Sequence, residues 1–140
     1  LCSNDSTSLG VTQAITQDYA GGNAVVITGQ DGDVANLRNI KDGKQSMTVY
    51  KAVANEAVVT LDLAKAILSG GTVDGSLISA SGWNFECAYD TDSCETTLGH
   101  KCPSFLLVPD VVTKDNMEEK LVTPGYYVVG SDGYLEATNG

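Results

Sequence analysis

The stretch "NAVVITGQDGDVANLRNIKDGKQSMTVYK" (residues 23–51) decides the fold, because two apolar runs flank one amphipathic segment. Residues 23–31 form a short continuous apolar run bounded by turn residues, which is typical of a strand buried on both faces of a parallel sheet. Residues 31–44 predict a short helix that ends at a glycine. Residues 45–51 predict the next strand, and it ends with no Gly, Pro or Asn to turn the chain.

In the predicted short helix, Asp33 is a candidate N-cap. Helical patterns also lie on both sides of residues 23–51. Residues 6–22 begin with Ser and Thr cap candidates, and residues 52–71 end at paired glycines. The inward positions of the short helix are Val34, Leu37 and Ile40, and the apolar stripe of the last helix is Ala54, Ala57, Val58, Leu61, Ala64 and Leu68.

The order of these elements defines a fold class. Residues 1–4 have the character of the end of an earlier strand, so strands and helices alternate three times along the first half of the chain. Alternation of this kind predicts right-handed crossovers and an α/β fold with a doubly wound parallel sheet.

The pattern changes after residue 71. Residues 72–103 show no sustained period and are rich in small polar residues, so we expect a long insertion with at most short strands. Residues 105–112 predict a strand in which Pro109 favours a bend or an edge position. Residues 115–120 predict a last helical turn, and the turn-rich tail is expected to wrap the surface.

The insertion carries three of the four cysteines: Cys87, Cys94 and Cys102, with Cys2 far away in the sequence. Their spacing does not match the paired C-x2-C pattern of zinc ribbons, which favours a disulfide-tied loop in an oxidising compartment. Four cysteines allow three full pairings, and the sequence does not choose among them. Cys2 is expected to be a small buried hydrophobe.

Charge excludes one class of partner. Eighteen acidic and eight basic residues give a formal net charge of −10, and no basic stripe is present. Phosphate backbones would be repelled, so we expect no nucleic-acid partner. The chain also lacks the run of about 20 apolar residues that a membrane span requires.

The sequence offers little for an enzyme. Its one histidine, His100, lies in the cysteine-rich segment without a Ser or Asp constellation. The chain has no G-x-S-x-G, no P-loop and no dinucleotide-binding glycine pattern. We therefore expect no catalytic residue, no cofactor and no metal.

Polar side chains follow each predicted strand, where open parallel sheets bind their ligands. An amide, a carboxylate and an ammonium at such an edge offer donors and acceptors to a small neutral polyol. Each group also has a plain structural alternative, as a helix cap or a solvated strand end. The pairs of residues at the three strand ends are Asn4 and Asp5, Gln30 and Asp31, and Tyr50 and Lys51.

Four phrases carry a resemblance: "LCSNDSTSLGV", "VVITGQDGD", "LRNIKDGKQSMTVYK" and "PSFLLVPDVVTKDN". Together they resemble the C-terminal half of the periplasmic-type sugar-binding proteins of ABC importers, in the ribose/galactose-binding group and nearest its D-xylose-binding branch. The resemblance covers residues 1–71 and 103–122 and not the insertion between them. It implies part of a type I periplasmic binding protein fold, with two α/β lobes joined by three crossing segments.

In that branch "TVYK" is one of the crossings, which implies that residues 45–51 need no turn because the chain passes between lobes. The resemblance implies three segments: residues 1–50 in the C-terminal lobe, 51–106 in the N-terminal lobe with the cysteine-rich insertion 72–103, and 107–140 as the return to the C-terminal lobe and the tail. The family's first lobe and its secretion signal would precede Leu1.

The resemblance also implies a function. Asn4, Asp31 and Lys51 match family positions that touch sugar hydroxyls, so the expected ligand is a monosaccharide, D-xylose first and glucose second. The expected partners are the permease subunits of an ABC importer and the missing N-terminal part of the same protein. The expected location is outside the cell membrane, either periplasmic or anchored as a lipoprotein on the outer face.

Two alternatives stay open at this point. The effector-binding domain of a lactose-repressor-type transcription regulator shares the fold, although a cytosolic protein would rarely keep disulfides. A sugar-modifying enzyme on a similar fold would need an acid and base pair, for which Asp5 and Asp31 are the candidates.

Overall fold

The computed structural model describes residues 1–138 and has an α/β fold. The chain forms two compact units: the first combines Leu1–Lys51 with the chain from Pro109 onward, and the second is Ala52–Val108. We describe each unit by itself. Within the described residues, no helix is both long enough and apolar enough to cross a membrane.

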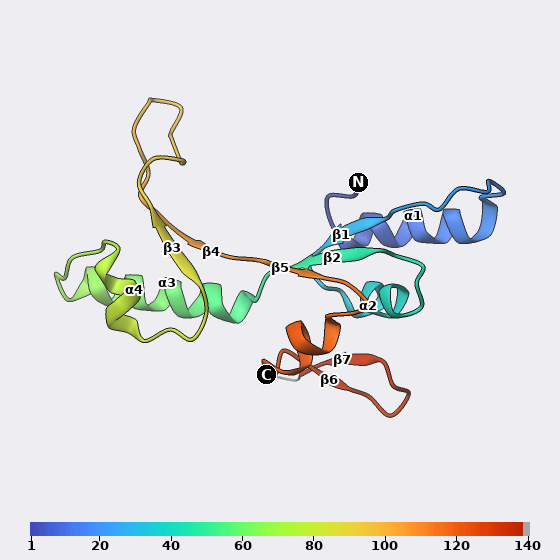
Figure 1. Cartoon of the computed structure of the whole chain (residues 1–140). Coiled ribbons are helices and arrows are strands. Elements are labelled where there is room, and N and C mark those ends of the chain that lie inside the picture. The colour runs from blue at the N-terminus through green and yellow to red at the C-terminus, as the bar shows by residue number, and fades with distance from the viewer. Residues whose placement is uncertain (139–140) are drawn as a thin grey trace. The chain divides into compact units, whose positions relative to one another are not determined.

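The first unit contains a sheet of three strands in the order β1-β2-β5 (Figure 1). β1 (Thr28–Gln30) and β2 (Met47–Tyr50) run parallel, as predicted for a βαβ crossover. β5 (Asp110–Val112) pairs with β2 in the antiparallel direction. The predicted parallel pairing is confirmed for β1 and β2. β5 adds an antiparallel strand and makes the sheet mixed, because the chain re-enters the first unit in the opposite direction.

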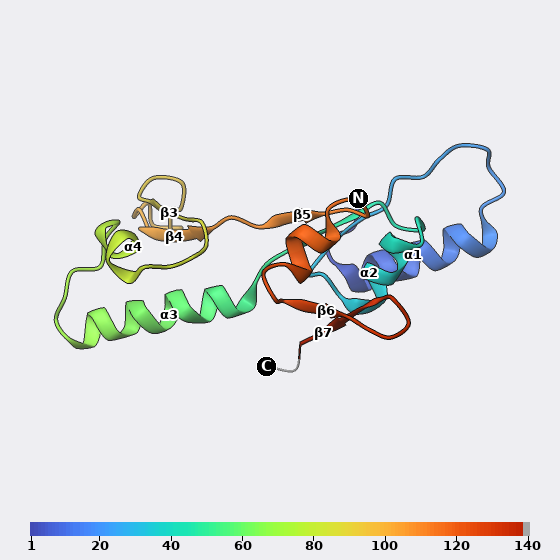
Figure 2. The ribbon, with the colours of Figure 1, turned by 60° about the horizontal axis from the view of Figure 1, so that its bottom comes forward.

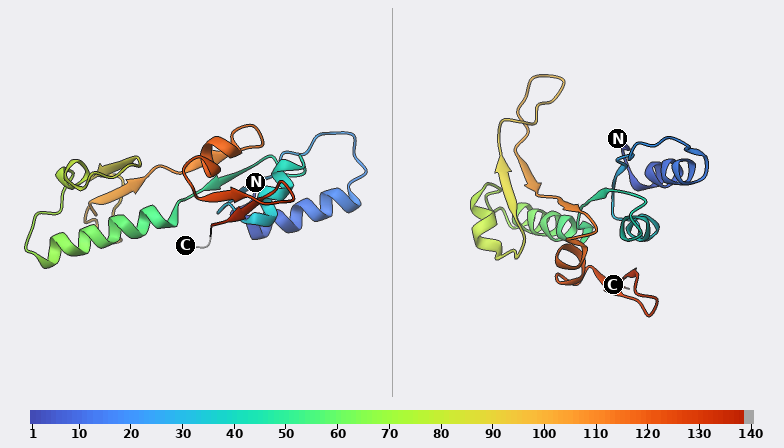
Figure 3. Two further views of the ribbon diagram at one scale, coloured as in Figure 1. Left: turned by 90° about the horizontal axis from the view of Figure 1, so that it is seen from below. Right: turned by 45° about the vertical axis from the view of Figure 1, so that its right-hand side comes forward.

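Three helical segments pack in the first unit (Figure 3). α1 (Asp5–Asp18) packs against β1 and α2, and α2 (Val34–Lys41) connects β1 to β2. α2 follows Asp33, but the predicted cap is not formed, because the Asp33 side chain makes no cap hydrogen bond. Gly43 lies just beyond the helix with a φ of 75°, the left-handed conformation in which glycine ends a helix at low cost. The predicted last turn is a short π-helix, Glu118–Val122.

The core of the first unit collects apolar side chains from α2, β5, the π-helix and a C-terminal hairpin. The hairpin pairs β6 (Tyr127–Val129) with β7 (Leu135–Ala137), and β7 packs against α2. The tail thus forms strands and contributes to the core, which the sequence did not predict. The buried residues of this core are Leu37, Ile40, Val112, Met117, Leu121, Tyr127 and Leu135.

The second unit pairs two helices with an antiparallel ribbon (Figure 2). α3 (Val53–Leu68) contacts β4 (Ser104–Leu107), and α4 (Ser76–Ser81) contacts β3 (Cys87–Asp90). β3 and β4 pair in the antiparallel direction. Aromatic rings contact one another in this unit: Trp83 with Phe85 and Phe105, and Tyr89 with Phe105. The Trp83 indole N–H also donates a 3.0 Å hydrogen bond to Asp62 of α3.

The region of the predicted insertion is more ordered than the sequence indicates. α4 and β3 both lie within residues 72–103, so the expectation of short strands at most is wrong for α4. The single strand predicted at residues 105–112 is two strands in different units, β4 and β5. They are separated at Pro109, which has no N–H to continue a ladder.

Two strand predictions near the N-terminus need correction. Residues 1–4 form no strand; the Cys2 backbone N–H donates to the Thr28 hydroxyl at 3.2 Å instead. β1 is only three residues long, and the preceding Val26 is 72% exposed although Ile27 is buried. β1 is an edge of this sheet, so the apolar run before it finds no partner strand among the described residues.

The apolar stripe predicted for α3 is on the exposed side of the helix. Leu61 is 56% and Leu68 is 87% exposed, whereas Val59 is buried and Leu63 is half-buried. The helix itself is confirmed, but the second unit packs against a different face of it. Val58, at 43% exposure, belongs to the same exposed stripe.

The predicted disulfides are absent from the structure, since all four cysteines are unpaired. Cys87 lies on β3 opposite Leu107 of β4. Cys94 and Cys102 face each other across the hairpin tip, where the Cys102 N–H donates to the Cys94 carbonyl at 2.9 Å. The tip is held by backbone hydrogen bonds and by an exposed ion pair of 2.9 Å between Lys101 and Glu95. The prediction of a disulfide-tied loop relied on the spacing of the cysteines alone, and that spacing was misleading.

The unit boundaries fall at Lys51/Ala52 and Val108/Pro109. These positions are within two residues of the crossings predicted after residues 50 and 106. The identification of the units with the two lobes of the resembling family stays a prediction.

Candidate functional site

Asp31 is the first candidate ligand-binding residue, and it directly follows β1. Its side chain is exposed, and its backbone has a φ of 109°, a region that residues other than glycine rarely adopt. The Asp31 N–H donates a 2.9 Å hydrogen bond to the carbonyl of Val49 on β2. The carboxylate therefore stands at the carboxyl-terminal edge of the two parallel strands.

Asn4 is the N-cap of α1. Its side-chain oxygen accepts a 2.9 Å hydrogen bond from the Thr7 N–H, and its backbone is extended. The plain structural alternative for Asn4, a helix cap, is therefore correct for the amide oxygen. The amide nitrogen takes no part in this bond.

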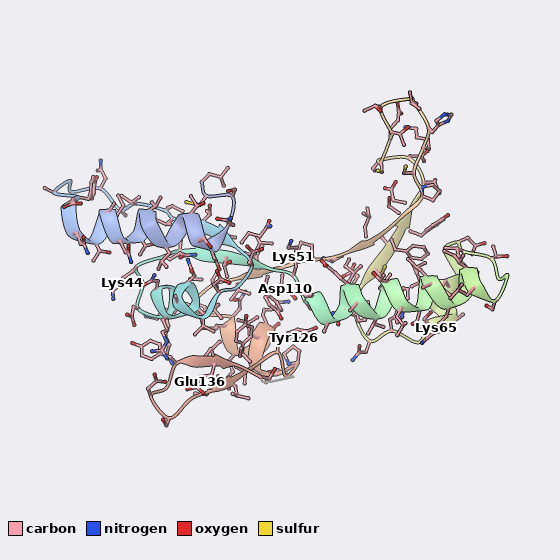
Figure 4. The ribbon with its side chains drawn as sticks, turned by 180° about the vertical axis from the view of Figure 1, so that it is seen from behind. Lys44, Lys51, Lys65, Asp110, Tyr126 and Glu136 are labelled. Atoms are coloured by element: carbon pink, nitrogen blue, oxygen red, sulfur yellow. The ribbon has the colours of Figure 1, made fainter. Side chains whose placement is uncertain are left out.

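Lys51 directly follows Tyr50, the last residue of β2, and its side chain is exposed. Figure 4 shows it close to Asp110 of β5, whose backbone pairs with Tyr50. The Asp110 carboxylate forms an ion pair of 3.0 Å with Lys120. None of the ion pairs formed within residues 1–138 includes Lys51.

Asp5, the residue after Asn4, links these positions. Its side chain is completely buried, and its Oδ2 atom accepts hydrogen bonds of 2.9 Å from the backbone N–H groups of Gly32 and Asp33. Asn4 and Asp31 belong to segments far apart in the sequence, and this carboxylate brings them to the same edge of the sheet. The structure thus places Asn4 and Asp31 at the same edge of the sheet. Lys51 lies one residue beyond the end of β2, the strand next to β1.

Polar groups surround the Asp5 carboxylate. Thr48 of β2 donates to it at 3.0 Å, and the Gln45 amide donates at 3.3 Å. Burial raises the pKa of the Asp5 carboxyl, and the hydrogen bonds from Asp33, Thr48, Gln45 and Gly32 act in the opposite direction. The net shift is upward, so removal from water has the larger effect.

Sequence reasoning missed this buried network. Two signals in the sequence could have indicated it: Thr48 in the middle of an apolar strand, and Gly29 within "TGQDGD". A Cβ atom on Gly29 would overlap the Asp5 carboxylate, and it would also crowd Gln45 and Ser8. The glycine is required for the close approach of α1 to β1.

Tyrosine rings lie beside the same edge. The Tyr50 ring lies 5.3 Å from Tyr126 and 5.8 Å from Tyr127, measured between centroids. Tyr127 is buried and donates a 2.7 Å hydrogen bond to the Gly32 carbonyl. Burial raises the pKa of Tyr127 to about 12, with smaller contributions from the charges of neighbouring groups.

Among residues 1–138, no three His, Cys, Asp or Glu side chains are grouped as they would be around a metal ion. Of the acid and base candidates, Asp5 is buried under four donors while Asp31 is exposed. The candidate residues at this edge carry an amide, a carboxylate and an ammonium group, which are able to hydrogen-bond to hydroxyl groups.

A mixed α/β sheet with hydrogen-bonding side chains at its carboxyl edge is typical of a binding protein for small polar ligands. Residues 1–72 match the periplasmic binding protein domain model, and the chain belongs to this family. It has part of the type I periplasmic binding protein fold.

Curated relatives agree with this assignment. The chain is 30% identical over 127 residues to the multiple sugar-binding periplasmic receptor ChvE of Rhizobium radiobacter, over 88% of this chain and 32% of the relative. It is 29% identical over 130 residues to the D-xylose-binding periplasmic protein of Escherichia coli, over 91% of this chain and 33% of the relative. The chain thus spans about a third of the length of these relatives, which are named as binding proteins rather than enzymes.

Solved structures are similar as well. An ABC transporter solute-binding protein from Clostridium phytofermentans with bound β-D-glucose is 38% identical, with a TM-score of 0.73 over 95% of this chain and 36% of that one. A carbohydrate transporter solute-binding protein from Chloroflexus aurantiacus, in complex with D-glucose, is 27% identical with a TM-score of 0.68. That match covers 89% of this chain and 32% of the other.

Proposed function

We propose that this chain is part of a solute-binding protein that binds a monosaccharide and delivers it to the permease of an ABC importer. The observation that carries the proposal is the placement of Asp31 and Lys51 at the carboxyl edge of β1 and β2, with Asn4 tied to the same edge through Asp5. Asn4, Asp31 and Lys51 are the proposed sugar contacts.

The three groups suit the hydroxyls of a sugar. A carboxylate accepts two hydrogen bonds from neighbouring hydroxyls, an ammonium donates to hydroxyl oxygens, and an amide N–H₂ donates to a third position. Bonds to charged groups are shorter and stronger than neutral ones. A sugar with a hydroxyl in the wrong place would leave a charged group unpaired, which is how such a set discriminates between epimers.

The proposed ligands are D-xylose and D-glucose. The name of one relative specifies D-xylose, and two similar structures contain D-glucose. These aldopyranoses share the arrangement of their ring hydroxyls at C2, C3 and C4 and differ at C5. A site that contacts only the hydroxyls at C2, C3 and C4 would bind both D-xylose and D-glucose. The shared stereochemistry of the two sugars therefore explains why both are proposed.

Isothermal titration of the full-length natural protein with D-xylose, D-glucose, D-ribose and D-galactose tests the proposal. We expect heat and saturable binding with D-xylose, D-glucose or both, and weaker binding of D-ribose and D-galactose. The absence of heat with all four sugars would refute the assignment to monosaccharides.

The location and the partners follow as part of the same proposal. We place the protein outside the cell membrane, either periplasmic or anchored to the outer face, because the named relatives are periplasmic. The remaining contacts to the sugar would come from a part of the protein other than this chain. Fractionation of cells followed by protease treatment of intact cells or spheroplasts checks the location, since an exported protein is digested without lysis.

The two units also receive a proposed assignment. We assign residues 1–50 and 107–140 to the C-terminal lobe and residues 51–106 to a segment of the N-terminal lobe. The compactness of each unit and the strand that leaves the first one at Lys51 without a turn support this assignment.

A further inference from the structure

The backbone at Asp31 is strained, and something must hold it. Asp31 is the one residue other than glycine within residues 1–138 that has a positive φ, at 109°, and Gly32 follows with 80°. A residue in such a conformation persists only where its surroundings fix it, and strain of this kind concentrates at functional sites. The groups that fix this backbone also fix the position from which the Asp31 carboxylate projects.

Three consecutive backbone N–H groups of this loop have fixed partners. The Asp31 N–H donates to the Val49 carbonyl, while the N–H groups of Gly32 and Asp33 both donate to Asp5 Oδ2, all at 2.9 Å. One carboxylate oxygen therefore receives the two N–H groups that directly follow the strained residue.

The Asp5 carboxylate is itself fixed from the side of β2. The Thr48 hydroxyl lies 3.0 Å from both of its oxygens, and the Gln45 amide donates to Oδ1 at 3.3 Å. The Asn36 amide of α2 donates to the Asp5 carbonyl at 2.9 Å. A buried carboxylate with this many donors has little freedom to move.

Asp5 is thus the common point of the three segments that carry the candidate contacts. Asn4 is its neighbour at the start of α1, Asp31 precedes the two N–H groups that it binds, and Lys51 directly follows the strand that contains Thr48. We propose that Asp5 is a positioning residue that sets the placement of Asn4, Asp31 and Lys51 for the ligand while remaining buried beneath them. This inference rests on the proposed function, since it concerns the same site.

The simpler alternative is that the Asp5 network only stabilises the fold. A purely stabilising role and a positioning role make different predictions. If the network only stabilises the fold, a variant that is destabilised but still folded keeps its affinity for the sugar. If Asp5 positions Asp31, a variant in which Asp31 is displaced loses sugar affinity. Leu121 provides the matched control, since it is fully buried in the core of the first unit and has no part in the network.

The test uses Thr48→Val and Thr48→Ser in the full-length natural protein. Valine keeps the shape of threonine but removes the hydroxyl donor, and serine keeps the donor. We expect Thr48→Val to weaken the binding of D-glucose and D-xylose at least tenfold and Thr48→Ser to stay within about threefold of the natural protein. Leu121→Ala, measured well below its unfolding temperature, is expected to bind both sugars normally.

A second readout does not depend on any sugar. Amide hydrogen exchange at Gly32 and Asp33, measured by NMR, reports directly on the two N–H groups bound to Asp5. We expect exchange at both positions to accelerate in Thr48→Val more than in Leu121→Ala. Asp5→Asn changes the proposed positioning residue directly. If that variant does not fold, the comparison of Thr48→Val with Thr48→Ser still tests whether Asp5 positions the candidate contacts.

The outcomes separate the inference from the proposed function. If the natural protein binds none of the sugars, the proposed function fails, and the amide exchange alone judges the role of Asp5. Normal sugar binding by a folded Thr48→Val variant, or unchanged exchange at Gly32 and Asp33, would overturn the positioning role.

Discussion

The Tyr127 hydroxyl donates a 2.7 Å hydrogen bond to the carbonyl of Gly32, a residue 95 positions earlier in the chain. This bond joins the C-terminal hairpin to the loop that carries Asp31. Asp5 holds the same loop through its N–H groups, so the loop is held from two sides by groups distant in sequence.

Replacing Tyr127 by phenylalanine tests this bond. Tyr127→Phe removes the donor and leaves a buried carbonyl without its partner, which we expect to cost about 1 kcal/mol of unfolding free energy. Chemical denaturation at neutral pH measures the loss.

Alkaline pH gives a second test at the same residue. The folded-state pKa of Tyr127 is about 12, above its ordinary value of 10.0, so its contribution to stability falls as the pH rises through this interval. The fall is expected to be smaller in Tyr127→Phe. The remainder is due to the other alkaline groups with raised pKa values: Tyr50, Tyr134, Lys120 and Cys87. Identical alkaline profiles for the two proteins would contradict the burial of the Tyr127 hydroxyl.

The raised pKa of Asp5 predicts an effect in acid. The unfolded carboxyl ionises near 3.8, whereas the folded one keeps its proton to higher pH, so the stability contributed by Asp5 falls as the pH rises through this window. We expect the advantage of the natural protein over Asp5→Asn to be largest at about pH 3 and to shrink toward neutrality.

Other carboxyl groups do not obscure this comparison. Five of them have pKa values lowered by hydrogen bonds, in some cases with a contribution from nearby cations, so these five act in the opposite direction and equally in both proteins. The difference between the proteins isolates Asp5, and a difference that grows with pH would show that its pKa is not raised. The groups with lowered pKa values are Asp42, Asp62, Asp74, Asp90 and Asp132.

Gly29 offers a steric test of the contact between α1 and β1. Gly29→Ala places a methyl group against the Asp5 carboxylate, and we expect a loss of about 1–3 kcal/mol in unfolding free energy, the range for overpacking. Gly10→Ala is the control, because Gly10 lies within α1 with open space around it, and alanine there should stabilise the protein by about 0.4–1 kcal/mol. Equal effects at the two positions would contradict the close approach.

The four unpaired cysteines predict a pattern of alkylation. Cys94 is exposed, whereas burial raises the pKa of the Cys87 thiol and so lowers its thiolate fraction. Iodoacetamide labelling of the folded protein followed by mass spectrometry should modify Cys94 well before Cys87. A disulfide-linked peptide in the unreduced protein would contradict the unpaired state of the four cysteines.

The sequence predicted α2 well and the face of α3 poorly, and the difference has a physical cause. Leu37 and Ile40 are buried as predicted, because the core around them comes entirely from the first unit. The helix period of α3 was correct, but a helix with apolar residues on several sides does not reveal which side is covered. In this structure Val59 faces its neighbours, while Leu61 and Leu68 do not.

The candidate site shows a similar limit. The strand-end rule indicated three pairs of residues, Asn4 and Asp5, Gln30 and Asp31, and Tyr50 and Lys51, and the family resemblance selected Asn4, Asp31 and Lys51 among them as candidates. It could not identify the role of Asp5, since nothing in "ND" distinguishes a solvated helix cap from a carboxylate buried under four donors. The network depends on Thr48 and Gln45, which reach Asp5 only after the sheet has formed.

Lys51 provides the most direct test of the central claim, that the carboxyl edge of β1 and β2 binds a monosaccharide. Lys51→Ala in the full-length natural protein removes the ammonium, and Lys44→Ala is the control, since Lys44 is exposed and paired with Asp42 (Figure 4). Titration with D-glucose and D-xylose should show a loss of about 1.5 kcal/mol, roughly tenfold in affinity, for Lys51→Ala and no loss for Lys44→Ala. Equal affinity in both variants would contradict the claim that Lys51 contacts the sugar.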